Sequence, residues 1–350
     1  MNYPTTEQQE KHEQTAVQVR ETSKRYREAL EAKTERYVQQ LQELEQRCQR
    51  PEAGREHLLD EITLLNDSIL AACGEFERHA DVDAEGLAEA RRKFREQTEI
   101  VLGKSRFISH ARTWPFGHPG DHQILEHAYR NTPMSEGIGW YLDRYCLNTT
   151  LSVAVRERKA MLTDLLRQEL ARKQGARVLD IACGSCRDVF ELAPEINATG
   201  ARFICVDFDD QALQFSANRL VHAGLSDEQV AMRQYNALRM VNHQRNLREF
   251  GEQDAIYSVG FFDYLQDDLL VKLFSSLREL LAPGGKLIAS FKDCRMYSSQ
   301  FYHWMVDWTG FAQRTVEESR DLFRRAGIAP EAITEVRDRS GVILFFLVSK

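Results

Sequence analysis

The sequence predicts an α/β fold in which an all-helical region precedes an open, mostly parallel sheet of seven strands. From residue 177 to residue 348, short apolar runs alternate with amphipathic helical stretches, which is typical of strands joined through helices. Before them, residues 13–102 show the three- and four-residue spacing of long helices. A loop of small residues at 182–186, directly after the first apolar run, indicates a ligand-binding turn at the end of a strand.

Length and composition fit a nucleotide-binding domain with an accessory region. The chain has 350 residues and a formal net charge of −7, which leaves no overall electrostatic footprint for nucleic acid. Seven irregularly spaced cysteines and the polar N-terminus, without a signal peptide, indicate a reducing, cytoplasmic setting. No apolar run approaches the roughly 20 residues of a membrane span. We therefore expect neither a nucleic-acid partner nor a membrane span.

The first predicted region, residues 1–110, is a helical bundle with coiled-coil-like character. Its long first helix, at about residues 13–50, carries one narrow apolar stripe and ends at Pro51. Two further helices are expected at residues 55–76 and 84–102. An antiparallel bundle or hairpin follows from this pattern, and the first helix is also available for homodimer formation.

The second predicted region, residues 111–172, is also helical and lies directly before the first strand. Asp121 is expected to cap a helix at residues 121–129, because a carboxylate can accept hydrogen bonds from the first free N–H groups. More helix is expected at residues 136–170. We expect this region to cover a substrate as a lid.

The third predicted region, residues 173–350, holds the sheet. Its strands are expected at residues 177–181, 202–206, 230–235, 254–259, 285–291, 333–338 and 342–348. Its helices are expected at residues 187–193, 210–223, 267–281 and 316–326. A short turn at residues 339–341 joins the last two strands.

The loop after the first strand has the composition of a cofactor-binding turn. Asp180 lies at the end of the strand, and the small residues after it allow a ligand to approach the backbone N–H groups. The second strand ends at Asp207, twenty-three residues after Gly184. An acid at that distance can accept hydrogen bonds from the two hydroxyls of a ribose. Dinucleotide-binding enzymes and methyltransferases share this combination.

Asp180 favours the second of these classes. With the loop, it resembles the Asp/Glu-x-Gly-x-Gly-x-Gly motif of class I S-adenosylmethionine (SAM) methyltransferases, although Ala182 and Cys186 replace two glycines. Asn236 after the third strand and the turn at residues 280–287 are also similar to that family. The resemblance covers residues 176–350. It implies a Rossmann-like sheet with an antiparallel seventh strand, and SAM as the cofactor.

The resemblance also implies which residues hold SAM. The expected cofactor-binding residues are Asp180, Ala182, Cys183, Gly184, Asp207, Phe208, Asn236, Ala237 and Val259. Cys183 and Cys186 formally make a Cys-x-x-Cys pair, which could serve redox chemistry or half a zinc site. Because both lie in the cofactor loop and no second pair is well placed, no metal is predicted.

A narrower similarity concerns the helical segment and a late insert. Both resemble bacterial fatty-acid methyl ester synthases, a group that includes enzymes making 3-hydroxypalmitic acid methyl ester. The usual Gly-Tyr-Ala run before the Gly-Asp pair is absent here. This similarity implies O-methylation, with a fatty acid or another carboxylate as one candidate acceptor. The matching positions are residues 120–121, 124–129, 142–145, 156–158, 305–308 and 314–318.

A methyltransferase must align a nucleophile behind an already activated methyl group and exclude water. A carboxylate nucleophile needs no base, but its burial requires cationic or hydrogen-bonding partners. The catalytic candidates are Tyr129, Tyr145 and His303: the two tyrosines are expected to touch ligand, and His303 to line the acceptor side. A structural role in a helix end or core is the alternative for each. Other side chains expected near the acceptor are His122, Tyr141, Arg144, Tyr297 and Trp304.

These observations predict a cytoplasmic SAM-dependent methyltransferase that acts on a small molecule. One alternative is a protein or peptide methyltransferase that recruits its partner through the helix around residues 26–44. Another is a non-catalytic SAM-binding scaffold, in which Ala182 and Cys186 mark a decayed loop. Residues 261–264 lack the Asn/Asp-Pro-Pro-Tyr pattern, which disfavours methylation of nucleic-acid bases.

Overall fold

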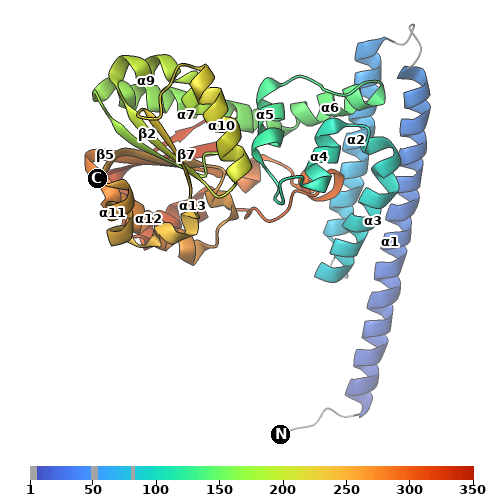
Figure 1. Cartoon of the computed structure of the whole chain (residues 1–350). Coiled ribbons are helices and arrows are strands. Elements are labelled where there is room, and N and C mark those ends of the chain that lie inside the picture. Colours follow the sequence, from blue (N-terminus) through green and yellow to red (C-terminus); the bar gives the residue numbers. More distant parts are fainter. Residues whose placement is uncertain (1–5, 49–53, 80–82) are drawn as a thin grey trace. The chain divides into compact units, whose positions relative to one another are not determined.

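A computed structural model describes residues 6–48, 54–79 and 83–350, with side chains described from residue 24 onward (Figure 1). The described residues form two compact units. The helical unit comes from the described parts of Met1–Pro115 and from Thr132–Leu147 and Ser299–Thr309; the sheet unit comes from Phe116–Asn131, Asn148–Ser298 and Gly310–Lys350. The units therefore interleave along the chain, unlike the three consecutive regions predicted at 1–110, 111–172 and 173–350.

The helical unit is built around three long helices. They pack with smaller helical segments from the middle and the end of the chain. The elements are α1 (Thr6–Cys48), α2 (Arg55–Glu77), α3 (Ala84–Leu102), α4 (Arg106–Thr113), α6 (Ile138–Asn148) and the π-helical turn η4 (Phe301–Met305). The first helix thus begins earlier than the predicted residue 13, and Pro51, its predicted end, lies outside the described residues.

Ion pairs define the directions of α1, α2 and α3. Arg47 of α1 meets Glu61 of α2, whereas Lys33 of α1 meets Glu75, so these two helices run antiparallel. Arg27 of α1 meets Glu89 of α3, and Glu45, later in α1, meets Lys104, just after α3. Helices α1 and α3 therefore run parallel. The exposed pairs contribute little stability, so apolar burial must hold the bundle together.

Trp304 of η4 completes the core of the helical unit. Its side chain is fully buried and meets Phe76 of α2 and Phe94 of α3 edge-on. The indole N–H donates a hydrogen bond to the Glu77 carboxylate over 2.8 Å. Trp304 was expected near the acceptor, but this packing gives it a structural role.

The sheet unit contains a seven-stranded sheet in the order β3-β2-β1-β4-β5-β7-β6. Only β7 runs against its neighbours β5 and β6, which confirms the predicted fold class and antiparallel seventh strand. The strands are β1 (Arg177–Ile181), β2 (Arg202–Asp207), β3 (Val230–Gln234), β4 (Gln253–Val259), β5 (Leu281–Lys292), β6 (Ile333–Arg337) and β7 (Ile343–Ser349).

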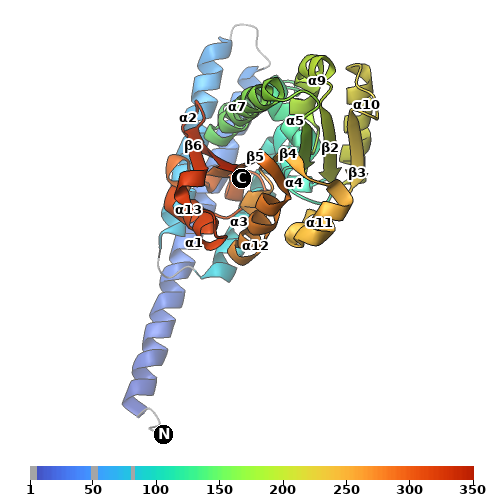
Figure 2. The ribbon, with the colours of Figure 1, turned by 90° about the vertical axis from the view of Figure 1, so that its left-hand side faces the viewer.

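Helices cover both faces of this sheet (Figures 1 and 2). Helices α7, α9 and α10 lie on one face, and α11, α12 and α13 lie on the other. The helices of this unit are α5 (His122–Arg130), α7 (Thr150–Arg172), α8 (Arg187–Glu191), α9 (Ala193–Thr199), α10 (Asp210–His222), α11 (His243–Phe250), α12 (Asp267–Leu280) and α13 (Val316–Arg325). Short 3-10 turns are η1 (Ala237–Val241), η2 (Phe262–Tyr264), η3 (Cys294–Met296) and η5 (Pro330–Ala332).

The observed elements differ from the predictions in a few places. The helix expected at residues 136–170 is divided between α6 and α7, with Thr149 as the cap between them. Strand β5 begins at Leu281 rather than at residue 285, because its pairing with β4 slips between Gln253 and Ala255. Helices α9 and α11 were not predicted. Asp121 caps α5 as expected, accepting from the N–H groups of the second and third residues of the helix.

None of the helices described is long and apolar enough to span a membrane.

We predict that Tyr37→Phe loosens the α1–α2 contact. The Tyr37 hydroxyl donates to Asn66 Oδ1 over 2.7 Å inside the core, and Asn66 is fully buried. Without that donor, the buried amide oxygen would lack a partner, at a cost of about 1–3 kcal/mol. Hydrogen exchange of the α2 amides should accelerate about tenfold or more. Tyr26→Phe is the control, because among the described contacts Tyr26 only stacks on His79; equal exchange in both variants would contradict the prediction.

Candidate active site

The loop between β1 and α8 holds three alternate residues in the left-handed backbone region. The φ angles are +57° at Ala182, +54° at Gly184 and +46° at Cys186. These are the three positions at which the resembled motif has glycine. Left-handed backbone costs a non-glycine residue roughly 1–2 kcal/mol, yet the loop keeps this conformation at Ala182 and Cys186. The two substitutions therefore preserve the loop geometry.

Hydrogen bonds from neighbouring elements hold the loop in place. The Cys183 N–H donates to the Val206 carbonyl of β2 over 3.1 Å, and the Cys186 N–H closes a turn onto the Cys183 carbonyl. The hydroxyl of Ser216 in α10 donates to the Gly184 carbonyl over 2.8 Å. The surrounding fold thus supports a backbone that would otherwise be strained.

Asp207 joins this loop to the end of β2. Its Oδ2 accepts the Gly184 N–H over 2.8 Å, and its Oδ1 accepts the Asp209 N–H over 2.9 Å. Burial raises the pKa of Asp207 above its ordinary value, although the two backbone hydrogen bonds oppose that shift. Each carboxylate oxygen retains a lone pair, so Asp207 can accept two further hydrogen bonds from a ligand.

The other predicted cofactor residues differ in what their side chains offer. Phe208 follows Asp207 and is 70% exposed, although phenylalanine side chains are usually buried. Asn236 is exposed and uses its side-chain oxygen to cap η1 at the Leu238 N–H. Ala237 is buried in the core of the sheet unit, so its side chain packs away from a ligand. Val259 is half-buried at the end of β4.

A buried acid pair lies behind the loop. The Tyr257 hydroxyl of β4 donates to Asp188 Oδ2 over 2.5 Å, and Asp180 Oδ2 is buried without a hydrogen-bond partner. Burial, followed by the Cys186 sulfur, raises the pKa of Asp188 to about 6. Burial and then Asp188 also raise the pKa of Asp180. Sequence reasoning did not anticipate Tyr257 or Asp188 here, because their contact joins residues far apart in the chain.

Three thiols also converge on this point. One carboxylate oxygen of Asp180 and the sulfurs of Cys183 and Cys186 lie within 4.8 Å of one another. The Cys205 thiol of β2 interacts with both cysteines. These contacts lower the pKa of Cys186 well below its ordinary value. The sequence provided no second Cys-x-x-Cys pair, but the fold adds a third thiol from the neighbouring strand.

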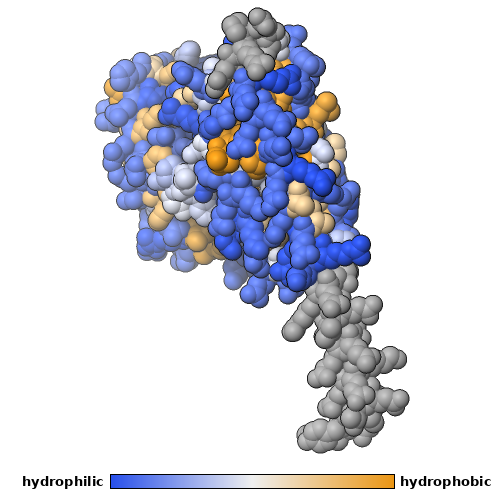
Figure 3. Space-filling model, turned by 90° about the vertical axis from the view of Figure 1, so that its right-hand side faces the viewer, coloured by the Kyte–Doolittle hydropathy of each residue, from blue (hydrophilic) through white to orange (hydrophobic). Residues whose placement is uncertain are grey.

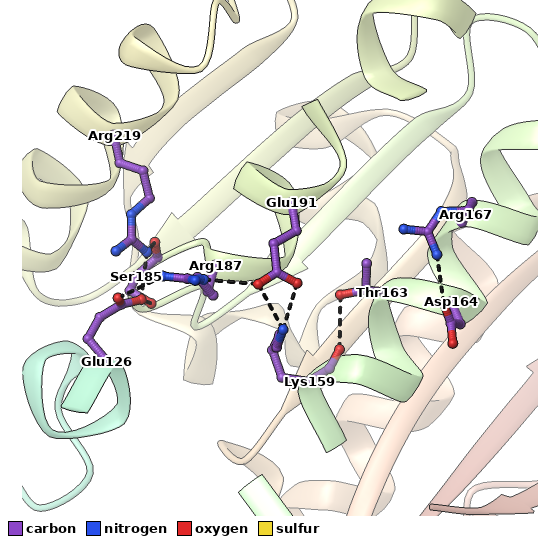
Figure 4. A network of polar contacts seen from close by, with 9 residues as sticks. All are labelled: Glu126, Lys159, Thr163, Asp164, Arg167, Ser185, Arg187, Glu191 and Arg219. Atoms are coloured by element: carbon purple, nitrogen blue, oxygen red, sulfur yellow. Dashed lines mark hydrogen bonds and ion pairs between the residues drawn. The ribbon is translucent and has the colours of Figure 1, made fainter. Parts of the chain in front are cut away.

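Glu126 fixes helix α5 to the cofactor loop (Figure 4). Its side chain is only 4% exposed, and its Oε1 accepts from the Ser185 hydroxyl over 2.9 Å and from Arg219 over 2.6 Å. Arg187 approaches Oε2 at 3.3 Å. Burial alone would raise the pKa of Glu126, but Arg219 and the other hydrogen-bond donors bring it below its ordinary value. The carboxylate therefore stays ionised and holds α5 against the loop.

His122, at the start of α5, lies near the acids at the end of β2. The ring is almost fully buried against Phe116 and Phe215, and its Nδ1 is 3.5 Å from Asp209 Oδ2. Burial lowers the pKa of His122, although Asp209 opposes that shift.

The three catalytic candidates do not share one unit. Tyr129 belongs to the sheet unit, where burial raises its pKa and the Arg158 charge opposes that shift. Tyr145 and His303 belong to the helical unit. There Tyr145 donates to Asp67 over 2.8 Å, and His303 Nδ1 lies 3.2 Å from Arg91.

The remaining acceptor-side candidates are also divided between the units. Tyr297 of the sheet unit donates to Gln313 Oε1 over 2.9 Å. Tyr141 is buried and Arg144 is half-buried in α6 of the helical unit.

We predict that Asp188→Asn changes how stability depends on pH. The folded chain keeps the Asp188 proton up to about pH 6, whereas the unfolded chain releases it near pH 4. The contribution of Asp188 to the free energy of unfolding therefore falls as pH rises from about 4 to 6. The variant has no such loss and can still accept from Tyr257. Above pH 6 it should be more stable than the wild type, by on the order of 2 kcal/mol.

Urea unfolding at a series of pH values tests this prediction. The two proteins should have similar stability near pH 4 and diverge towards pH 7. Asp227→Asn, at an exposed acid of the same unit, is the control. A difference between Asp188→Asn and wild type that does not vary with pH would contradict the assigned titration.

Comparison with known proteins gives the class of the sheet unit. A family model described as a methyltransferase domain matches residues 179–287. No curated protein matches the chain. A solved structure described as a possible exported protein from Bordetella parapertussis is 17% identical, over 92% of this chain and 96% of that one, with a TM-score of 0.53. That likeness supports the fold.

Weaker structural matches include two named methyltransferases. Magnesium protoporphyrin IX methyltransferase from Synechocystis PCC 6803 is 13% identical, over 58% of this chain and 84% of that one, with a TM-score of 0.42. A SAM-dependent methyltransferase from Aquifex aeolicus is 13% identical, over 53% and 88%, with a TM-score of 0.38. The family match and the strand order together show that this chain carries a SAM-dependent methyltransferase domain with the class I fold.

Proposed function

We propose that this protein methylates an oxygen atom of a small molecule and binds SAM at the loop between β1 and α8. The observation that carries the proposal is the pairing of that loop with Asp207. The loop keeps left-handed backbone at all three motif positions, and Asp207 retains lone pairs beside it. Strained backbone conformations are typically kept at functional sites, so the two left-handed non-glycine residues argue against a decayed loop.

The residues present fit the chemical groups of SAM. A Cβ atom added to Gly184 would meet nothing within 4 Å, so the backbone is open to a ligand there. Asp207 can accept from both ribose hydroxyls, and the exposed Phe208 ring can stack on a purine. The proposal assigns the methionine part of SAM to the backbones of Ala182, just after β1, and Val259, at the end of β4. Asn236 and the Ala237 backbone complete the expected adenosine side.

The role of this chain in catalysis is positioning. Bound SAM would supply an electrophilic methyl group, so the protein must orient an acceptor oxygen towards it and exclude water. Glu126 restricts α5 against the loop and keeps Tyr129, one turn later, at the same end of the sheet unit. Tyr129 keeps its proton at neutral pH, since burial raises its pKa. It can therefore orient an acceptor as a hydrogen-bond donor.

A carboxylate is the acceptor class that we propose, with a fatty acid as one candidate. The similarity of the helical segment to fatty-acid methyl ester synthases supports this proposal. A carboxylate also needs no base, so the contacts of His118 and His122 with Asp209, at 4.0 and 3.5 Å, are not required for the transfer.

Cytoplasmic location and homodimer formation stay predictions. All seven cysteines are free, as in a reducing compartment. A groove between α1 and α2 is lined by Lys33, Arg36 and Tyr37 of α1 and by Leu65 and Ile69 of α2. Figure 3 shows a mainly hydrophilic face on which apolar residues form small groups.

Calorimetric titration with SAM and S-adenosylhomocysteine tests the proposed cofactor site. We expect micromolar binding by the wild type and binding about ten- to a hundredfold weaker by Asp207→Asn, because charged hydrogen bonds to the ribose would be lost. Asp227→Asn should bind as the wild type does. A folded wild type that binds neither compound would overturn the proposal. If binding is found, turnover of methyl-labelled SAM with a panel of fatty acids and other carboxylates tests the acceptor class.

Gly184→Ala should separate binding from stability. Its Cβ would face open space, so the left-handed backbone strain should cost only about 1 kcal/mol. The same methyl group would obstruct a ligand that approaches the loop backbone, so we expect SAM affinity to fall at least tenfold. Gly175→Ala is the matched control. Gly175 has a similar φ of +65° and similar open space, but it lies before β1. Equal SAM affinity in the two variants would exclude ligand approach at Gly184.

A further inference from the structure

Arg158 of α7 is a buried guanidinium without a described ion-pair partner. Arg158 is only 3% exposed, and its Nε atom has no hydrogen-bond partner. No carboxylate of the described chain lies within ion-pair distance of it, whereas its helix neighbours Lys159 and Arg167 are paired with Glu191 and Glu195. A buried charge normally requires a partner, because its desolvation costs several kcal/mol.

The guanidinium lies against the backbone at the carboxyl end of β4. A Cβ atom on Gly260, the residue after this strand, would come within 2.9 Å of Arg158 Nη1 and 3.2 Å of Nη2. Gly260 also has a φ of +99°, which favours glycine. Ligands of open α/β sheets bind outside the carboxyl ends of the strands. Arg158 therefore lies where a ligand is expected.

The other charged groups nearby are already engaged. Lys292, at the end of β5, is buried and paired with Asp263. Burial lowers the pKa of Lys292, and the positive charge of Arg158 adds to that shift. Asp188 accepts from Tyr257. Only the Tyr129 hydroxyl interacts directly with Arg158 among the described side chains, and a phenol does not neutralise a guanidinium.

We propose that Arg158, assisted by Tyr129, binds a carboxylate group of a ligand in this site. The inference rests on the proposed function. A guanidinium offers parallel N–H groups that match the two oxygens of a carboxylate, and the Tyr129 hydroxyl can donate a further hydrogen bond. Two ligands of a methyltransferase can supply that carboxylate: the methionine part of SAM and an acidic acceptor.

Binding assays with paired probes distinguish these sources. S-Adenosylhomocysteine carries the methionine-derived carboxylate, and 5′-methylthioadenosine lacks it. If Arg158 binds the cofactor, Arg158→Gln should weaken S-adenosylhomocysteine binding about ten- to a hundredfold and leave 5′-methylthioadenosine binding unchanged. If Arg158 binds the acceptor, both nucleosides should bind normally. Octanoate should then bind the wild type saturated with S-adenosylhomocysteine more tightly than it binds the variant, with octanol binding unchanged.

Two further variants complete the design. Arg167→Gln replaces an exposed arginine of the same helix and should match the wild type in every assay. Arg158→Lys keeps the positive charge but lacks the planar guanidinium, so its affinity for the carboxylate probe should lie between those of the wild type and Arg158→Gln. If Arg158→Gln does not fold, Arg158→Lys serves as the test variant. Normal S-adenosylhomocysteine binding by the Arg158 variants, together with no Arg158-dependent octanoate binding, would overturn this inference. Failure of the wild type to bind S-adenosylhomocysteine would instead overturn the proposed function.

Discussion

The hydrogen bond from the Gly184 N–H to the Asp207 carboxylate connects the two features on which the site depends. Parallel pairing of β1 with β2 places Ile181 beside Val206, so the loop after β1 and the acid after β2 must emerge together. The acid then stabilises a loop whose left-handed residues are costly. The same carboxylate keeps lone pairs for a ligand, so one group both supports the loop and recognises what the loop binds.

The site also holds groups that reduce stability. Burial raises the pKa values of Asp180, Asp188 and Asp207, which means that each is more costly to ionise here than in water. Tyr257 offsets part of the cost at Asp188, but one oxygen of Asp180 has no partner. Perturbed acids of this kind cluster at functional sites more often than in ordinary cores. Their position behind the cofactor loop therefore favours a working site over a decayed one.

The sequence was informative where structure follows from local pattern. Buried apolar runs located β1 without error, and the spacing of small residues located the loop at residues 182–186. Helix α11 was missed because it is short and mostly polar. Contacts between distant residues could not be predicted from the sequence. Trp304 lies in an aromatic-rich segment, and only the fold shows that it fills the core of the helical unit. The burial of Arg158 was hidden for the same reason.

Two cationic side chains are buried near the carboxyl ends of the strands, and they differ in whether an acid pairs with them. Lys292 has an acid of its own, Asp263, whereas Arg158 has only a phenol and the Gly260 backbone. If both cations were structural, the same pairing would be expected for both, since an unpaired buried charge is the costlier arrangement. Arg158 also lies on α7, the helix that leads directly into β1 and its loop. An anion bound there would be held by the same rigid element that positions the cofactor loop, so the missing acid is better explained by a ligand than by imperfect packing.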